Sequence, residues 1–427
     1  MDKGIILINP PSPFLINQKC FSPLGILYLA AALEKNGIPV KAVDLADCED
    51  DLELALENYL EEGFLYGITS STPQYPYAIK IKDIIRKKNK NARIIIGGAH
   101  PSSLADKCLK DGFDNVVVGE GEDAILSIVK AIEKKKDLSS LIQLPYIPDL
   151  DSIPHPARHL LPIKSYGYDI GEGSATTIIT SRGCAFSCVF CSKDVWQRSM
   201  RFHSVDYVTE ELKKIISEYG IRYFLFLDDA INLKRDRILA LCAKIKPLGI
   251  KWRCYARAEL NAREVIDAMK EAGCVEIGVG IESGSQKILD IVGKGSSVKK
   301  NTSFVRDCQE AGIAVNAFIM IGLPGETHET AEETKQWMEE LRPDKFGFNI
   351  FMPYAGTPVC RNPQNYDLVI YDIPEEHSWV KGRQGEYHCY VATSKLSSRE
   401  ILRLFTELFD YYTHLINWKP GVGSLTN

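Results

Sequence analysis

Short apolar runs alternate with amphipathic runs along most of these 427 residues, and this alternation constrains the fold more than any other feature. In the first series, from residue 3 to about 145, the apolar runs have the length of buried strands. Runs with helical periodicity lie between them, at Leu24–Asn36, Tyr77–Lys88 and Ala124–Lys134. Such alternation predicts an α/β fold with a parallel, doubly wound, Rossmann-like sheet. The predicted strands are Gly4–Asn9, Val40–Leu45, Leu65–Ser70, Ala92–Gly97 and Asn115–Gly119.

A second series of the same kind follows, with helical runs such as Ser204–Tyr219 and Arg263–Ala272. Its six β/α units predict a partial (β/α)6 barrel, in which catalytic residues lie at the carboxyl ends of the strands. The predicted strands are Thr176–Ser181, Tyr223–Asp228, Trp252–Arg257, Val275–Glu282, Val315–Leu323 and Lys345–Met352.

A polar, proline-punctuated stretch separates the two series and reads as a domain connection. We therefore expect a Rossmann-like domain (1–145), a linker (146–172), the barrel (173–358) and a small helical C-terminal segment (359–427). That last segment is rich in aromatic residues, including Trp379, and carries a core-facing apolar pattern over Ser398–Ile416. We expect its helix to pack across the barrel mouth, and a place in the substrate pocket is the alternative.

Composition narrows the class of protein. The formal net charge of −5 gives no reason to expect nucleic-acid binding. The longest apolar run, Leu24–Leu33, is about half of what a membrane span needs, and the start lacks a signal-peptide layout. Nine of the twelve cysteines are scattered singly, which is typical of buried thiols in a reducing cytoplasm.

The other three cysteines lie in one short loop after the first barrel strand. Cys184, Cys188 and Cys191 have the spacing C-x3-C-x2-C. Three thiolates on one loop are able to hold three irons of a [4Fe-4S] cluster, which normally takes four cysteines, so one iron stays open to another ligand. Phe190 offers such a ligand an aromatic face. A structural zinc site and a redox pair of Cys188 and Cys191 remain as alternatives.

This loop resembles that of the radical S-adenosylmethionine (SAM) enzymes, in which the open iron binds the amino and carboxylate groups of SAM. The resemblance implies that Asp228 and Asp229 receive the ammonium group, although most relatives have a glycine-glycine-glutamate run there. Arg253 and Arg257 close the next strand, and an arginine there would grip the carboxylate in a bidentate manner. We expect this role of Arg257.

Two later strand ends complete the implied SAM site. Glu282 suits the ribose or an arginine partner, and an internal ion pair with Arg257 is the alternative. Gly322 and Pro324 belong to a turn whose backbone would meet adenine. The run from Gly293 to Ser296 lacks the upstream glycine of a phosphate-binding loop, and we interpret it as a solvated turn.

The strand ends of the first series also carry unusual residues. Glycines there let backbone approach a ligand closely, and hydroxyls offer it polar contacts. No G-x-G-x-x-G follows the first strand, so a dinucleotide is disfavoured. The candidate ligand-binding residues are Pro10, Leu24, Gly25, Ser70, Thr72, Gly97, Gly98, His100, Gly119, Glu120 and Gly121.

The runs Gly97-Gly98-x-His100 and Gly119-Glu120-Gly121 resemble those of the cobalamin-binding domain that precedes many radical SAM domains. The chain departs from the wider cobalamin family because it has no D-x-H-x-x-G, and so no histidine stands in the usual place of a lower axial ligand. We interpret His100 as a turn-stabilising residue rather than a cobalt ligand. A Rossmann-like domain that binds nothing is the alternative.

Together the resemblances imply a cobalamin-dependent radical SAM methyltransferase. A reduced [4Fe-4S] cluster on the three cysteines would cleave SAM, and the 5′-deoxyadenosyl radical would remove hydrogen from an unactivated carbon. Methylcobalamin would then supply the methyl group, and a one-electron reductant such as ferredoxin or flavodoxin would be required. Ring formation or rearrangement, methylation of phosphorus or of an sp2 carbon by another route, and a non-enzymatic iron–sulfur or zinc protein stay open.

The sequence constrains the identity of the substrate less than it constrains the fold and the cofactors. The chain carries no long C-terminal extension that would help to enclose a bulky natural product. We therefore expect a peptide or protein side chain, as in relatives that methylate residues of methyl-coenzyme M reductase, with a small molecule as the alternative. Nucleic acid and membrane are not expected as partners.

Overall fold

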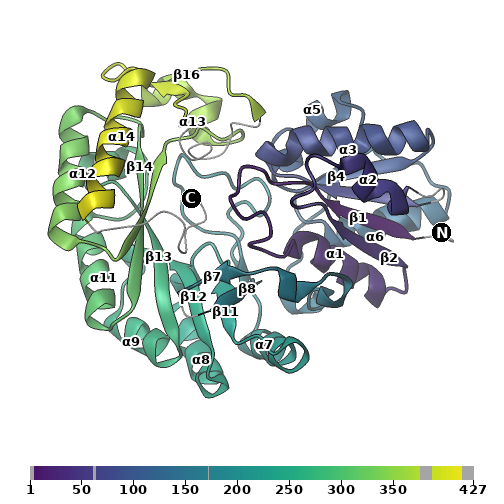
Figure 1. Cartoon of the computed structure of the whole chain (residues 1–427), viewed down its shortest axis with the longest axis horizontal. Coiled ribbons are helices and arrows are strands. Elements are labelled where there is room, and N and C mark those ends of the chain that lie inside the picture. The colour runs from purple at the N-terminus through teal and green to yellow at the C-terminus, as the bar shows by residue number, and fades with distance from the viewer. Residues whose placement is uncertain (1–3, 61–63, 172, 376–386, 416–427) are drawn as a thin grey trace. The chain divides into compact units, whose positions relative to one another are not determined.

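The computed structural model describes residues 4–60, 64–171, 173–375 and 387–415 (Figure 1). The chain forms two compact units, each built on its own sheet: the first is the chain up to Gly167 with later short segments such as Lys193–Gln197, and the second is the remainder. The predicted α/β fold is confirmed: a doubly wound sheet comes first, and a half-barrel with a helical C-terminal segment follows.

The first unit contains a six-stranded parallel sheet in the order β2-β1-β3-β4-β5-β6. All five predicted strands are present, with ends within one residue of the prediction. The sixth strand has only three residues at the sheet edge, too few for a readable pattern. The strands are β1 (Ile5–Asn9), β2 (Val40–Asp44), β3 (Leu65–Thr69), β4 (Arg93–Gly97), β5 (Asn115–Val118) and β6 (Leu141–Gln143).

Helices cover both faces of this sheet because successive strand side chains point to opposite sides. Ile5 and Leu7 of β1 pack with α1 (Leu24–Lys35) and α6 (Glu122–Glu133). Ile6 and Ile8 pack on the other face, against the helices that follow β2, β3 and β4. Those helices are α2 (Leu52–Leu56), α3 (Tyr75–Lys88) and α5 (Ala105–Lys110), and the short α4 (Ala99–Ser103) precedes α5.

The stretch predicted as a linker packs on the first unit. The Ala157 backbone N–H donates to the Leu27 carbonyl at 3.0 Å, and the Tyr166 hydroxyl donates to the Asp44 carboxylate at 2.5 Å. Three 3-10 turns give it a fixed path: η3 (Leu150–Ser152), η4 (Arg158–Leu160) and η5 (Ile163–Ser165).

The second unit contains a seven-stranded sheet in the order β15-β14-β13-β12-β11-β8-β7. Six strands are parallel, as predicted, and the two-residue β7 pairs with β8 in the antiparallel direction. The strands are β7 (Tyr168–Asp169), β8 (Ser174–Ile178), β11 (Tyr223–Phe226), β12 (Lys251–Ala256), β13 (Cys274–Glu282), β14 (Ala314–Ile321) and β15 (Lys345–Ile350).

Helices cover the outer face of this sheet and bury a large apolar cluster against it. They are α7 (Val205–Tyr219), α8 (Arg235–Ile245), α9 (Arg263–Glu271), α10 (Gln286–Ile291), α11 (Val298–Glu310), α12 (His328–Leu341) and α14 (Ser398–Leu415). Shorter elements are β9 (Ser181–Arg182), β10 (Arg201–Phe202), α13 (Pro358–Arg361), β16 (Val369–Ile370) and β17 (Val391–Ala392).

Helix α14 does not pack across the barrel mouth, so that prediction was wrong. Its apolar face lies against the outward-facing aromatic residues of β15: the rings of Phe348 and Phe405 are 5.8 Å apart, and those of Phe346 and Tyr412 are 5.6 Å apart. It lies beside α12, since the Tyr412 hydroxyl donates to the Lys335 carbonyl (Figure 1). Helix α14 therefore acts as the sixth helix of the half-barrel. Ile416 and Trp379 lie outside the described residues.

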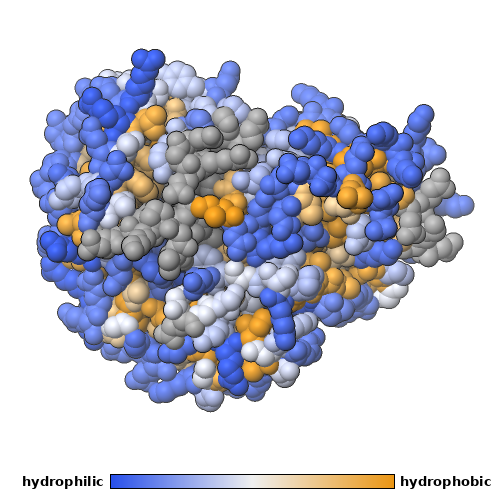
Figure 2. Space-filling model, in the orientation of Figure 1, coloured by the Kyte–Doolittle hydropathy of each residue, from blue (hydrophilic) through white to orange (hydrophobic). Residues whose placement is uncertain are grey.

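The visible face in Figure 2 is mostly hydrophilic, with hydrophobic residues in separate patches. Large exposed apolar side chains, such as Ile16 and Leu54, come from different elements of the described chain. None of the described helices has both the length and the apolar character required to cross a bilayer.

Candidate cofactor site

The three-cysteine loop leaves the barrel at the end of β8. Gly183 has φ +88°, and a Cβ there would overlap the Ser199 carbonyl, so only glycine allows this close approach directly before Cys184. Cys184 is half-buried, Cys188 is buried and Cys191 is exposed, and none of the three forms a disulfide. Three thiolates in eight residues fit the donor chemistry of an iron–sulfur cluster. The three sulfur atoms do not lie close enough together to hold a metal ion as they stand. No other group of three His, Cys, Asp or Glu side chains within the described residues does so either.

Backbone contacts hold the middle of this loop. The Val189 N–H donates to the Val292 carbonyl at 3.0 Å, and the Val189 carbonyl accepts from the Val359 N–H at 3.3 Å. Phe190 is half-buried and packs against the barrel core. Its predicted role beside SAM stays a prediction.

Arg257 approaches the loop from the end of β12. Its Nη1 donates to the Cys188 sulfur at 3.6 Å, and its guanidinium carbon lies 3.6 Å from the centre of the Phe186 ring. The guanidinium also pairs with Glu259 and donates to the Lys294 carbonyl. Burial alone would lower the pKa of Arg257, but the charges of Glu259 and Cys188 outweigh it and raise that pKa.

Glu282 pairs with Lys294 rather than with Arg257, so the ion pair considered from the sequence was wrong. The Lys294 Nζ lies 2.6 Å from a Glu282 carboxylate oxygen, and both side chains are less than a tenth exposed. Glu282 has φ +67°, a left-handed conformation that a residue with a Cβ rarely adopts. The strain lies at the end of β13, where the register with β14 shifts.

The run from Gly293 to Ser296 is only in part the solvated turn predicted from its sequence. Gly295 is exposed and Gly293 is half-buried, but Lys294 and Ser296 are buried. Pattern reasoning missed Lys294 because its partner Glu282 lies twelve residues earlier, at the end of a different element.

Asp228 is buried beneath the start of the cysteine loop. Its carboxylate accepts from the Thr180 N–H at 3.2 Å, from the Thr180 hydroxyl at 2.8 Å and from the Ser181 hydroxyl. Burial raises the pKa of Asp228, and these hydrogen bonds oppose the shift. The neighbouring Asp229 is exposed. Asp228 and Asp229 were both expected to receive the ammonium group of SAM, but their surroundings differ.

The turn after β14 contains the two residues predicted to meet adenine. Gly322 and Pro324 are both buried, and Gly322 has φ +91°. The Gly322 N–H donates to the Glu326 carboxylate at 3.2 Å, and the Thr330 hydroxyl donates to its other oxygen at 2.8 Å. Burial raises the pKa of Glu326 to about 7.

Arg253, four residues before Arg257, is engaged elsewhere in the barrel. Its guanidinium lies 2.9 Å from the Glu276 carboxylate, whose second oxygen meets Lys345 at 2.7 Å, and it also contacts Tyr168. Arg253 is 1% exposed. It is therefore part of the barrel interior, away from the cysteine loop.

In the first unit, the predicted cobalamin residues gather at the carboxyl ends of β1, β3, β4 and β5. Gly98 has φ +110°, and a Cβ there would lie 2.9 Å from the Ser70 carbonyl oxygen, so the two strand ends meet closely. In contrast, a Cβ on Gly25 would meet nothing within 4 Å. Gly119 has φ +87°, and Gly97 is not left-handed. Glycine and open space at these strand ends fit a bulky ligand.

The remaining candidates in this unit are mostly buried. His100 is fully buried and stacks on Tyr75 with ring centres 3.9 Å apart. Burial lowers its pKa to about 4, and neither ring nitrogen has a hydrogen-bond partner. The Glu120 carboxylate accepts from the Ile147 N–H at 2.9 Å. Pro10, Leu24 and Ser70 are buried, whereas Thr72 and Gly121 are half-buried.

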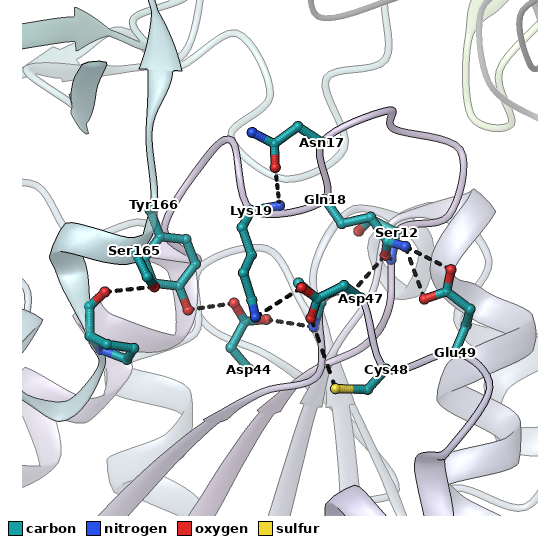
Figure 3. Close-up of polar contacts among 12 residues, drawn as sticks. Ser12, Asn17, Gln18, Lys19, Asp44, Asp47, Cys48, Glu49, Ser165 and Tyr166 are labelled. Carbon is teal, nitrogen blue, oxygen red and sulfur yellow. Dashed lines mark hydrogen bonds and ion pairs between the residues drawn. The ribbon is translucent and has the colours of Figure 1, made fainter. Parts of the chain in front are cut away.

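A polar network holds the loop after β1, which the sequence did not predict (Figure 3). The Gln18 side-chain oxygen accepts from the backbone N–H groups of Ser12 and Asp47, and its amide donates to Glu49 at 2.9 Å. Lys19 pairs with Asp47 at 2.9 Å. The loop is thereby tied to the segment that follows β2, so the strand end that carries Pro10 has a fixed environment.

Comparisons with known proteins match both units. Residues 18–129 match the model of the B12 binding domain, and residues 178–338 match that of the radical SAM superfamily. The chain is 32% identical over 377 residues to an uncharacterized methyltransferase of Pyrococcus horikoshii, covering 83% of this chain and 81% of that protein. It is 27% identical over 364 residues to an anaerobic magnesium-protoporphyrin IX monomethyl ester cyclase of Cereibacter sphaeroides, covering 79% of this chain and 59% of the cyclase.

Solved structures share the whole fold. The radical SAM methyltransferase TsrM of Kitasatospora setae, with cobalamin and a [4Fe-4S] cluster bound, superposes with a TM-score of 0.74 at 19% identity. The match covers 96% of this chain and 92% of TsrM. The cobalamin-dependent radical SAM enzyme OxsB, with aqua-cobalamin bound, gives a TM-score of 0.77 at 18% identity, covering 97% of this chain and 67% of OxsB.

Proposed function

This chain belongs to the radical SAM superfamily, as a member with a B12-binding domain, and on that premise we propose that it is a cobalamin-dependent C-methyltransferase. The observation that carries the proposal is the pairing of a three-cysteine loop at a barrel strand end with a B12-binding unit in one chain. The Pyrococcus horikoshii relative is named a methyltransferase, and the match spans most of both chains.

We assign the [4Fe-4S] cluster to Cys184, Cys188 and Cys191. When bound, the cluster and SAM supply a radical that removes a hydrogen atom from a carbon, and cobalamin supplies the methyl group. The chain's own contribution is position: Asp228 holds the loop start, and Val189 holds its middle through backbone hydrogen bonds.

For SAM we propose charged and backbone groups at the barrel strand ends. The exposed Asp229 suits the ammonium group, and Glu282, held by Lys294, suits the ribose. Gly322 and Pro324 offer backbone to adenine, and Phe190 an aromatic face. Arg257, predicted to grip the carboxylate, has its guanidinium already engaged by Glu259, Lys294 and Cys188.

For cobalamin we propose the strand ends of the first unit, where Gly25 has open space beside it and Gly98 lets the end of β4 approach the Ser70 backbone. No step is assigned to His100 as a cobalt ligand, because its ring is fully buried against Tyr75. The domain limits predicted from the sequence are kept as part of the same proposal.

The substrate we propose is a peptide or protein side chain. Helix α14 covers the outer face of β15, and only short elements follow β15 before it within the described residues. This leaves few described residues to enclose a bulky molecule above the strand ends. The reductant would be a ferredoxin or flavodoxin, and the nine cysteines scattered singly along the chain favour a reducing cytoplasmic setting.

Anaerobically reconstituted protein tests the proposal with SAM, cobalamin and a strong reductant. Formation of both 5′-deoxyadenosine and S-adenosylhomocysteine is expected, because radical formation and methyl transfer consume SAM differently. Formation of 5′-deoxyadenosine alone would favour ring formation or rearrangement. If neither product formed, the assignment would be refuted. Cys184→Ala, Cys188→Ala and Cys191→Ala should each abolish the formation of 5′-deoxyadenosine.

A further inference from the structure

Arg257 has an unusually complete set of contacts for a residue at a strand end. The Asn232 side chain holds its backbone from both sides: the Asn232 amide donates to the Arg257 carbonyl at 2.9 Å, and its oxygen accepts from the Arg257 N–H at 3.0 Å. Asn232 is itself buried. The base of the Arg257 side chain is therefore fixed before any side-chain contact is made.

The guanidinium is fixed as well. The face of the Phe186 ring, the Lys294 carbonyl and Glu259 leave it one orientation, with Nη1 directed at the Cys188 sulfur at 3.6 Å. The Arg257 side chain is 9% exposed, so water screens this contact little. A positive charge is thus held beside one sulfur of the loop.

Glu259 balances that charge. Its side chain is 4% exposed, and its second oxygen has no hydrogen-bond partner. A buried carboxylate placed this way lowers the field that Arg257 exerts on the Cys188 sulfur. Arginine and glutamate therefore act on that sulfur with opposite signs.

Hydrogen bonds to cluster sulfurs and nearby charge set the reduction potential of iron–sulfur clusters. Reduction adds one negative charge, so a donor or cation beside a ligand sulfur favours the reduced state, and an anion disfavours it. We propose that Arg257, with Glu259 as its counter-charge, sets the reduction potential of the cluster from the side of Cys188. This inference rests on the proposed function, because it requires a cluster on the three cysteines.

The test is an anaerobic redox titration of the reconstituted protein, followed by electron paramagnetic resonance. Arg257→Gln is expected to lower the midpoint potential, because it removes the cation. Glu259→Gln is expected to raise it, because Gln retains a hydrogen-bond acceptor for Arg257 while the negative charge is lost. Shifts in the same direction, or no shift in either variant, would overturn the proposal.

Arg237→Gln is the matched control for a loosened loop. Arg237 carries the same charge and supports the start of the same loop, since it donates to the Thr180 carbonyl at 2.8 Å and to the His203 carbonyl at 3.0 Å. A potential shift smaller than that of Arg257→Gln is expected. An equal shift would contradict the proposal, since loop position alone would explain both.

Two failures are distinguishable. Wild-type protein that assembles no iron–sulfur cluster would refute the proposed function. Wild-type protein that assembles the cluster and cleaves SAM, while the Arg257 and Glu259 variants keep its potential, would refute this inference alone. If the Arg257→Gln protein assembles no cluster, the sign of the shift in midpoint potential caused by Glu259→Gln still decides whether the proposal holds.

Discussion

Asp228 holds Thr180 through two of its polar groups, since one carboxylate oxygen accepts from both the backbone N–H and the hydroxyl of Thr180. The third group, the Thr180 carbonyl, accepts from Arg237. Thr180 lies four residues before Cys184, so these contacts fix the point from which the cysteine loop leaves the barrel. This is a structural role that the resemblance to SAM-binding acidic residues did not indicate.

Asp228→Ala should therefore lower the iron content of the reconstituted protein. The change removes three hydrogen bonds to a buried carboxylate, and we expect a loss of about 2–4 kcal/mol in stability. Iron per chain and the thermal midpoint are the measurements. Asp236→Ala, at an exposed position on α8, is the control. Full iron content with weaker SAM binding alone would instead place Asp228 against SAM.

Gly98→Ala should reduce cobalamin retention while iron content stays. Its left-handed backbone and the Ser70 carbonyl 2.9 Å away leave no room for a Cβ. Gly37→Ala is a matched control for backbone strain, because Gly37 is also left-handed, with φ +71°, and its Cβ would meet nothing within 4 Å. The cobalt-to-iron ratio is the measurement. Equal cobalt retention in both variants would count against this placement of the cobalamin site.

Lys294→Met should destabilise the barrel unit by about 3–5 kcal/mol, because it leaves the Glu282 carboxylate buried without a partner. The double variant Glu282→Gln with Lys294→Met should recover most of that loss. Thermal unfolding of both variants tests this. Arg306→Ala breaks the exposed pair with Glu340 and should cost less than about 1 kcal/mol. A Lys294 variant as stable as the Arg306 variant would refute the buried pair.

Glu326 should make stability fall as pH rises. Its folded pKa of about 7 lies above the unfolded value of 4.5, so its contribution is present below pH 4.5 and is lost as pH rises through about 7. The full effect is about 3 kcal/mol. Glu326→Gln should remove this decline between pH 5 and pH 8, measured by thermal unfolding. Glu329→Gln, at an exposed position on α12 three residues later, should keep it.

Periodicity was sufficient to predict both sheets, because each strand buries side chains on known faces. The first-unit strands alternate between two apolar clusters, which is the pattern that a doubly wound sheet requires. Short strands such as β6 and β7 were missed, since three or two residues carry no periodic signal. Helix α14 was predicted, but its partner was not, because an apolar face does not specify which surface covers it.

The residues of the functional site were likewise predictable only in part. The cysteine spacing is local and readable, and so are the glycines at strand ends. The pairings Glu282–Lys294 and Arg257–Glu259 depend on where separate segments meet in three dimensions. Lys294 was predicted to lie in a solvated turn, whereas in the fold its side chain is buried and paired with Glu282.

The central claim is best tested by quantifying iron, sulfide, cobalt and zinc in anaerobically purified, reconstituted protein, together with its absorption spectrum. The account predicts about four irons with matching sulfide and about one cobalt per chain. Iron without cobalt would leave a radical SAM enzyme whose first unit serves only as scaffold. Zinc in place of iron would contradict the account.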